Sequence, residues 1–252
     1  MTFPALQRAS LRLRSHRPFP LPRAPWVMGQ SWDRLLFAHW RVPPRELELL
    51  VPSGLAIDTY EGEAWLGVTP FRVVGLHPRL LPPLPRVSTF LETNVRTYVI
   101  RDGTPGIFFF RLLATSRIAV EGARLGYSLP YRCAEGSMRC DDDITDYLIR
   151  LKDPGAEQAQ MHVRYAAASR FSPAPRRSLE HWLVERYCLY TQTPGGQLLR
   201  THIHHAPWSI TPAKVSMNLQ GLAPAALGAL HPQPLVHHAD RQHVLVWAPN
   251  PA

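Results

Sequence analysis

The segment 90–99 places polar side chains at every second position: Glu92, Asn94, Arg96 and Tyr98. In an extended strand these four side chains share one face, and the opposite face carries apolar and threonine side chains. Glu92 and Arg96 then lie about 13 Å apart along the strand, too far for an ion pair, so each needs another partner or a ligand. Lining of a ligand cavity and ordinary pairing on the surface both remain open for this face.

A second group of candidate residues follows Gly126. Here Pro130 interrupts an expected strand, which indicates an edge, a bulge or a bend. A bend can turn Tyr131 and Arg132 into a pocket. The alternative is an edge strand with a solvated arginine.

Histidines form a third group, at His202, His204 and His205. In a strand His202 and His204 share a face and could chelate a metal. No carboxylate accompanies them in the sequence, and twelve histidines in the chain make chance clusters common. Motifs for serine hydrolases, P-loops and dinucleotide binding are absent from the sequence. We therefore expect no metal and no cofactor, and the role of the histidine cluster stays open.

The charge of the chain limits its partners. The sequence has 28 basic and 19 acidic residues, a formal net charge of +9, and five arginines of the first 25 residues supply more than half of it. The remainder shows no basic stripe interleaved with aromatic residues, so we expect no nucleic-acid partner. The longest stretch without charged residues, 215–239, contains three prolines and three histidines and does not predict a membrane span.

Cysteine usage and the N-terminal sequence indicate the compartment and the domain boundary. Cys133, Cys140 and Cys188 lack a CxxC spacing, so we expect neither a disulfide framework nor a zinc site, and a reducing cytoplasm fits. Residues 1–27 are basic and rich in proline. We interpret them as a disordered extension or as the product of a misassigned start, with Met28 as the initiator. Residues 28–252 are predicted to form one domain.

From about residue 32 onward, short segments rich in β-branched and aromatic residues alternate with proline and glycine. This pattern predicts an α+β, β-dominated fold, most economically a closed or nearly closed barrel with a few short peripheral helices. Ser116 predicts a short helix to Ala123, followed by a strand over 125–140. Ser178 predicts another short helix, with one face formed by Leu179, Trp182, Leu183 and Arg186.

Several runs of the sequence, taken together and in this order, resemble the YqjF-like bacterial family of unknown function. The resemblance spans roughly residues 30–248. The runs are Leu35-Leu36-Phe37-Ala38-His39-Trp40, the segment 90–99, Leu129-Pro130-Tyr131, Glu185-Arg186-Tyr187-Cys188-Leu189-Tyr190 and His204-His205-Ala206-Pro207-Trp208. That family is grouped with the acetoacetate decarboxylase-like fold, so the resemblance implies a β-barrel with a central small-molecule cavity.

The sequence departs from the decarboxylases at their reactive lysine. In those enzymes a Gly-Phe-Pro-Lys-Lys run supplies a lysine that forms a Schiff base, and its pKa is lowered by the neighbouring lysine. Tyr131 and Arg132 stand in the equivalent run here, and neither can form an imine. The two lysines of the chain, Lys152 and Lys214, do not lie near it in the sequence. The resemblance also implies that Glu92 corresponds to a glutamate facing that lysine.

Together these observations predict a cavity for a small anionic or carbonyl compound. We expect Glu92 and Tyr131 to act as catalytic acid or base, and the ligand-binding side chains to be Asn94, Arg96, Arg132 and His39. One hypothesis is an enzyme of lyase or isomerase type acting on a small oxo- or hydroxy-carboxylate. The alternative is a non-catalytic protein that binds or senses a small ligand. The sequence does not decide whether the chain forms a homo-oligomer.

Overall fold

Segments rich in β-branched and aromatic residues form strands along most of the chain. The computed structural model describes residues 2–84, 87–152, 158–231 and 233–252. Its strands are β1 (Met28–Val42), β2 (Ala56–Ile57), β3 (Ala64–Pro78), β4 (Phe90–Arg101), β5 (Thr104–Ala114), β6 (Tyr131–Asp141), β7 (Ile144–Leu151), β8 (Gln160–Ala167), β9 (Ser172–Pro173), β10 (Cys188–Gln192), β11 (Leu198–His204), β12 (Ser209–Gln220), β13 (Leu235–Val246) and β14 (Asn250–Pro251). Its helices are α1 (Phe3–Ala9), α2 (Pro44–Glu48), α3 (Arg117–Tyr127) and α4 (Leu179–Val184), with single 3-10 turns at Ser10–Arg12 and Ala225–Leu227.

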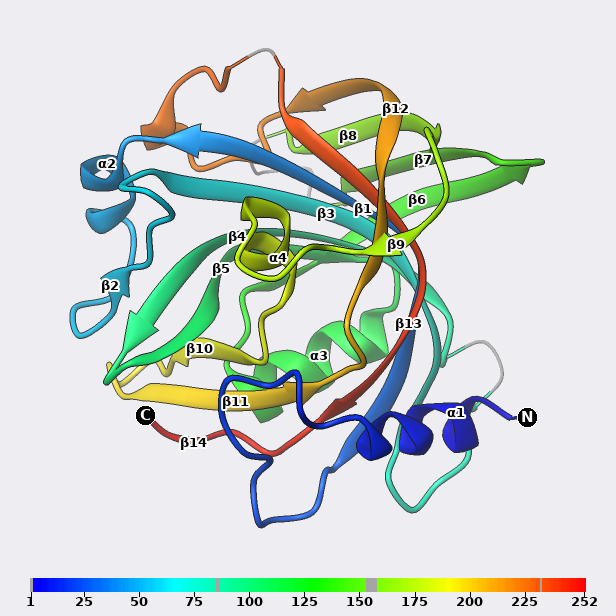
Figure 1. Ribbon diagram of the computed structural model, residues 1–252, viewed down its shortest axis with the longest axis vertical. Coiled ribbons are helices and arrows are strands. Elements are labelled where there is room, and N and C mark those ends of the chain that lie inside the picture. The colour runs from blue at the N-terminus through cyan, green and yellow to red at the C-terminus, as the bar shows by residue number, and fades with distance from the viewer. Residues whose placement is uncertain (1, 85–86, 153–157, 232) are drawn as a thin grey trace.

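The strand pairings close the sheet into two rings that share five strands (Figure 1). The first ring runs through β1, β3, β4, β5, β10, β11 and β13. The second ring leaves β5 through β6, β7, β8 and β12 and rejoins the shared strands at β13. The strand-dominated fold predicted from the sequence is thus confirmed, with its sheet arranged as two rings rather than as one simple barrel.

Strands β3 and β4 are buried on both faces along most of their length, as is the second half of β1. Along β1, Leu35 and Phe37 belong to a core inside the first ring, whereas Leu36 and Ala38 belong to a second core. The second core is completed by β7 and β8, whose Tyr147, Ile149, Met161 and Val163 are fully buried. Strand β4 follows the same alternation and separates the two cores.

Helix α3 joins two parallel strands, β5 and β6, and one edge of it lies over the first ring. Ser116 caps the helix as predicted, because its Oγ accepts a hydrogen bond from the Ala119 backbone N–H. The prediction that a strand starts at residue 125 is wrong, since the helix continues to Tyr127 and ends at Ser128 in a left-handed conformation. Pro130 therefore lies in the loop before β6 and does not interrupt a strand.

Residues 2–27 lie against the sheet. The Gln7 side chain is fully buried and donates hydrogen bonds to Ser31 Oγ and to the Gly75 carbonyl oxygen. Arg17 donates a hydrogen bond to the Ile203 carbonyl oxygen at 2.8 Å. The described part of this segment is thus folded onto β1, β3 and β11, and a translation start at Met28 stays a prediction. Within the described residues, no helix is both long and apolar enough to cross a membrane.

Candidate functional site

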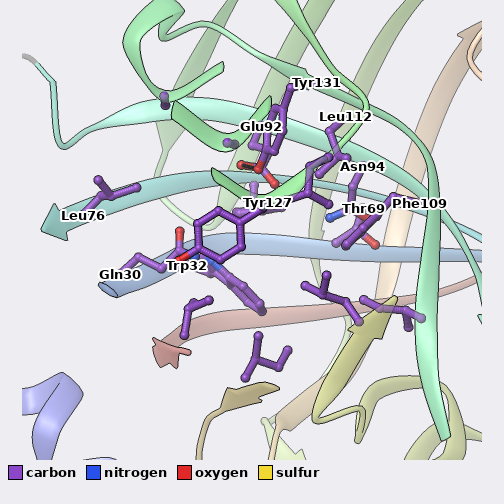
Figure 2. A pocket seen from close by; sticks show the side chains of 18 of the residues that line it. Gln30, Trp32, Thr69, Leu76, Glu92, Asn94, Phe109, Leu112, Tyr127 and Tyr131 are labelled. Carbon is purple, nitrogen blue, oxygen red and sulfur yellow. Dashed lines mark hydrogen bonds between the residues drawn. The ribbon is translucent and has the colours of Figure 1, made fainter. Parts of the chain in front are cut away.

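A cavity of about 320 Å³ lies inside the first ring. Most of its lining side chains are aliphatic or aromatic, and Figure 2 shows several of them around the open space. The polar side chains that line it are Gln30, Thr69, Glu92, Asn94, Arg96, Tyr127, Tyr131, Arg186, Thr201 and His205. A mainly apolar cavity with a few polar groups is typical of a small-molecule site.

The strand register gives the cavity two distinct ends. Glu92 pairs across the strands with Ala114, the last residue of β5 before helix α3. Arg96 pairs with Phe109 farther along β5, and its neighbour Tyr98 donates a hydrogen bond to the Leu183 carbonyl oxygen of α4. We call these the α3 end and the α4 end. The cavity reaches the surface at the α3 end, where the lining residue Ile118 is 67% exposed.

Glu92 and Tyr131 form a hydrogen-bonded pair at the α3 end (Figure 2). The Tyr131 hydroxyl donates to Glu92 Oε2 at 2.9 Å. Burial raises the pKa of Glu92 to about 8, although the hydrogen bond from Tyr131 acts in the opposite direction. Near neutral pH this carboxyl group therefore exists in both protonation states, as a general acid or base requires.

Asn94 and Thr69 face each other across β4 and β3 in the middle of the cavity (Figure 2). Both side chains are almost completely buried. Asn94 Oδ1 and Thr69 Oγ1 have no hydrogen-bond partner among the described residues. A buried polar atom without a partner costs stability, so both atoms are suited to meet a ligand or an ordered water.

Arg96 lies at the α4 end and is 7% exposed. Its guanidinium carbon lies 5.3 Å from the ring centroid of Phe37 and 6.0 Å from that of Tyr98. No carboxylate of the described chain pairs with it, and its Nε has no hydrogen-bond partner. A buried cation without a counter-ion is costly, which makes this end of the cavity attractive to an anion.

Arg186 is a second arginine at the α4 end and was not predicted as a site residue. It is 5% exposed and forms a salt bridge of 2.5 Å with Asp58 through Nη1, while Nη2 has no partner in the described residues. Its guanidinium carbon lies 4.2 Å from the Trp182 ring centroid and 4.8 Å from that of Tyr98. One sequence signal was available, because the predicted face of the helix after Ser178 combined Arg186 with three apolar residues.

Four of the six predicted site residues line the cavity, and two do not. Glu92, Asn94, Arg96 and Tyr131 contribute to its wall. His39 is buried beside Arg96, where its Nε2 lies 2.7 Å from the Tyr98 hydroxyl, and burial lowers its pKa well below the ordinary value. Arg132 is half-buried on β6, has an interaction partner, and is not among the residues that line the cavity. Direct contact of His39 or Arg132 with a ligand stays a prediction.

Neither lysine of the chain is near this cavity wall. Lys152 and Lys214 are both exposed, and neither lines the cavity. The cavity wall described here therefore offers no primary amine for imine formation.

The histidine cluster has other partners. His204 Nε2 lies 2.9 Å from the Ser10 carbonyl oxygen, and His205 Nε2 lies 3.1 Å from the Arg186 carbonyl oxygen. Burial lowers the pKa of both rings, which favours their neutral forms. Across the described ranges no group of three or more His, Cys, Asp or Glu side chains is arranged to hold a metal ion.

Comparison with known proteins identifies relatives and structural neighbours. Residues 29–243 match DUF2071, a family described as an uncharacterized conserved protein. The chain is 41% identical over 229 residues to the uncharacterized protein YqjF of Bacillus subtilis, covering 90% of this chain and 93% of that one. The acetoacetate decarboxylase of Legionella pneumophila superposes with a TM-score of 0.64 at 14% identity, covering 95% and 93% of the two chains. The enduracididine biosynthesis enzyme MppR complexed with pyruvate gives 0.63 at 12% identity, with 93% and 92% covered. These structures establish the acetoacetate decarboxylase-like fold.

Proposed function

The chain belongs to the DUF2071 family, whose members are described only as uncharacterized, and we propose that it binds a small carboxylate in the cavity of the first ring. The observation that carries this proposal is the buried guanidinium of Arg96, which lines the cavity without a carboxylate partner in the described residues. Arginine is the side chain best suited to hold a carboxylate through paired hydrogen bonds. Neighbouring Asn94 and Thr69 supply further unpaired polar atoms.

We further propose that Glu92 exchanges protons with the bound compound. With an oxo-carboxylate, Glu92 would take a proton from the carbon next to the carbonyl, and the electron pair would move onto the carbonyl oxygen to give an enolate. Return of a proton to the same carbon regenerates the substrate with exchange of its hydrogen, whereas protonation of the carbonyl oxygen gives the enol isomer. The high pKa of Glu92 and its hydrogen bond from Tyr131 support this role. Imine chemistry is not part of the proposal, because the lining residues include no lysine.

One structural neighbour is described as complexed with pyruvate, a small oxo-carboxylate, which is consistent with this ligand class. The alternative function is binding or sensing without catalysis. The predominance of aliphatic and aromatic side chains in the wall favours that alternative, because such a wall can hold a ligand without acting on it. The reducing cytoplasm proposed from the cysteines fits either function.

Two measurements test the proposal. Isothermal titration calorimetry with small carboxylates should detect binding to the natural chain and none to Arg96→Met. Incubation in D₂O with straight-chain oxo-carboxylates, which carry the carbonyl at different distances from the carboxylate, tests the proton exchange. Those long enough to place the carbonyl beside Glu92 should exchange hydrogen for deuterium next to it, which proton NMR measures, and Glu92→Gln should lose this exchange. Binding without exchange above the protein-free rate would support the non-catalytic alternative. Equal binding by Arg96→Met would contradict the carboxylate site.

A further inference from the structure

The two ends of the cavity offer different chemistry and are far apart. Glu92 and Arg96 are separated by four residues of strand β4, or about 13 Å of backbone. The Arg96 guanidinium carbon lies 6.0 Å from the ring centroid of Tyr98, toward the α4 end, and 5.3 Å from that of Phe37, which borders the middle of the cavity. On this backbone spacing, we expect a ligand that contacts both groups to be longer than two to four carbon atoms.

Two arginines, rather than one, define the α4 end. The guanidinium groups of Arg96 and Arg186 both lie within 6.0 Å of the Tyr98 ring centroid. Arg186 shares its charge with Asp58, whereas Arg96 has no such partner in the described chain. The buried hydroxyl of Thr201 also lines the cavity and has no hydrogen-bond partner within the described residues. The two arginines and Asp58 leave one positive charge unbalanced at this end, and one carboxylate group of a ligand would balance it.

The wall between the ends is apolar. It includes Trp32, Phe71, Ile107, Phe109 and Leu112. A cavity of about 320 Å³ lies at the small end of the range typical of small-molecule sites, which favours a ligand smaller than most drug-sized compounds. The long axis, the apolar wall and the volume together describe an elongated molecule with one anionic end.

We infer that the ligand is a medium-chain monocarboxylate, with its carboxylate between Arg96 and Arg186 and its chain along the apolar wall toward Glu92 and Tyr131. This inference rests on the proposed carboxylate site and adds two things to it: the length of the ligand and the second arginine. The chain of the ligand then places its far end, and any carbonyl or hydroxyl group there, beside the Glu92–Tyr131 pair.

A series of straight-chain carboxylates from acetate to dodecanoate tests the length by titration calorimetry. We expect the affinity to rise about fourfold for each added CH₂ from butanoate to about octanoate, because each buried CH₂ contributes about 0.8 kcal/mol. The affinity should fall for longer chains, and octanol should bind far more weakly than octanoate. No gain between butanoate and octanoate would overturn the inference. If pyruvate and acetate bind to the natural chain and not to Arg96→Met, the proposed carboxylate site stands even though the inferred ligand length is wrong. If no carboxylate binds to the natural chain, the proposed site and the inferred ligand are both wrong.

Two variants test the second arginine with octanoate as the probe. Arg186→Met should weaken octanoate binding at least tenfold. Asp58→Asn removes the carboxylate that competes for Arg186, so it should strengthen octanoate binding severalfold, a gain that a purely structural role does not give. Unchanged or weaker binding by Asp58→Asn overturns the role of Arg186, and this variant decides the question even if Arg186→Met does not fold.

Discussion

The two faces of strand β4 are equally buried but differ in how their polar groups are satisfied. On the packed face, which points to the second core, Thr93 Oγ1 lies 2.9 Å from the Tyr147 hydroxyl, and Thr97 Oγ1 donates to the Trp65 carbonyl oxygen at 2.9 Å. On the cavity face, Asn94 Oδ1 and Arg96 Nε have no partner in the described residues. Both faces belong to one strand, so backbone geometry does not cause the difference.

Within one strand, this contrast distinguishes side chains that stabilise the fold from side chains that are available to a ligand. Buried polar groups in proteins are almost always hydrogen-bonded, and the packed face follows that rule. The cavity face breaks it beside an empty space, at a cost in stability that a ligand would repay. The polar residues of the cavity face are therefore expected to be retained for binding, and those of the packed face for folding.

The largest effect concerns Glu92 and pH. Because the folded-state pKa of Glu92 is raised from 4.5 to about 8, folding favours its protonated form. Its contribution to stability is present below pH 4.5 and is lost as the pH rises toward and through 8. Glu92→Gln has no carboxyl group to ionise, so its free energy of unfolding should not show this loss. The difference in free energy of unfolding between Glu92→Gln and the natural chain should therefore grow as the pH rises. Each unit of pKa difference contributes about 1.4 kcal/mol, which gives several kcal/mol in all. Thermal melts of both proteins from pH 4 to 9 measure it. A constant difference across this range contradicts the prediction.

The next effect is expected at Arg96. Arg96→Met should lower the affinity for a bound carboxylate at least about 100-fold, because a charge-assisted contact is lost. The same variant should unfold at a higher temperature, because an apolar side chain replaces a buried charge that lacks a counter-ion. Calorimetry and thermal melting measure the two effects. Arg139→Met, on an exposed position of β6, is the matched control and should change neither. A less stable Arg96→Met variant would mean that this arginine has a structural role.

Much of this arrangement could be predicted from the sequence because it follows local periodicity. The period of two over 90–99 predicted that Glu92, Asn94 and Arg96 share a face, and all three line the cavity. Tyr131 was predicted to line the pocket through a bend at Pro130, but the reason was wrong. The left-handed residue Ser128 ends helix α3, and the loop that follows it leads into Tyr131 at the start of β6.

Other features depended on contacts between distant segments, which local periodicity does not give. The second arginine of the site is brought to Tyr98 by the position of α4, which periodicity does not give. His39 shares the apolar run of β1 and lies beside Arg96, yet the Tyr98 hydroxyl occupies its Nε2. The division of the sheet into two rings depends on β5 pairing with β4, β6 and β10, a branching that a linear pattern of strands does not reveal.

A smaller effect should distinguish two neighbouring positions of β4. Val95 is fully buried in the second core, and Val95→Ala should lower the free energy of unfolding by about 2 kcal/mol because it leaves a cavity. Carboxylate affinity should stay within about twofold of the natural value. Asn94→Leu, one residue away on the cavity face, should weaken binding without loss of stability. Denaturant titrations and calorimetry of both variants measure this. If Val95→Ala alters affinity as strongly as Asn94→Leu, the two faces are not independent.

The smallest effect compares two buried threonines that differ only in having a hydrogen-bond partner. Thr93→Val removes the hydroxyl that pairs with Tyr147 and should cost about 1 kcal/mol, because the Tyr147 hydroxyl keeps its other hydrogen bond, to the Glu92 carbonyl oxygen. Thr69→Val removes an unpaired hydroxyl from the cavity wall and should be neutral or stabilising, because no buried group loses a partner. Both changes have the same shape and size, so denaturant melts of the ligand-free proteins isolate the hydrogen bond. Equal losses from the two variants would mean that Thr69 has a partner in solution, such as an ordered water, and that the cavity face is satisfied without a ligand.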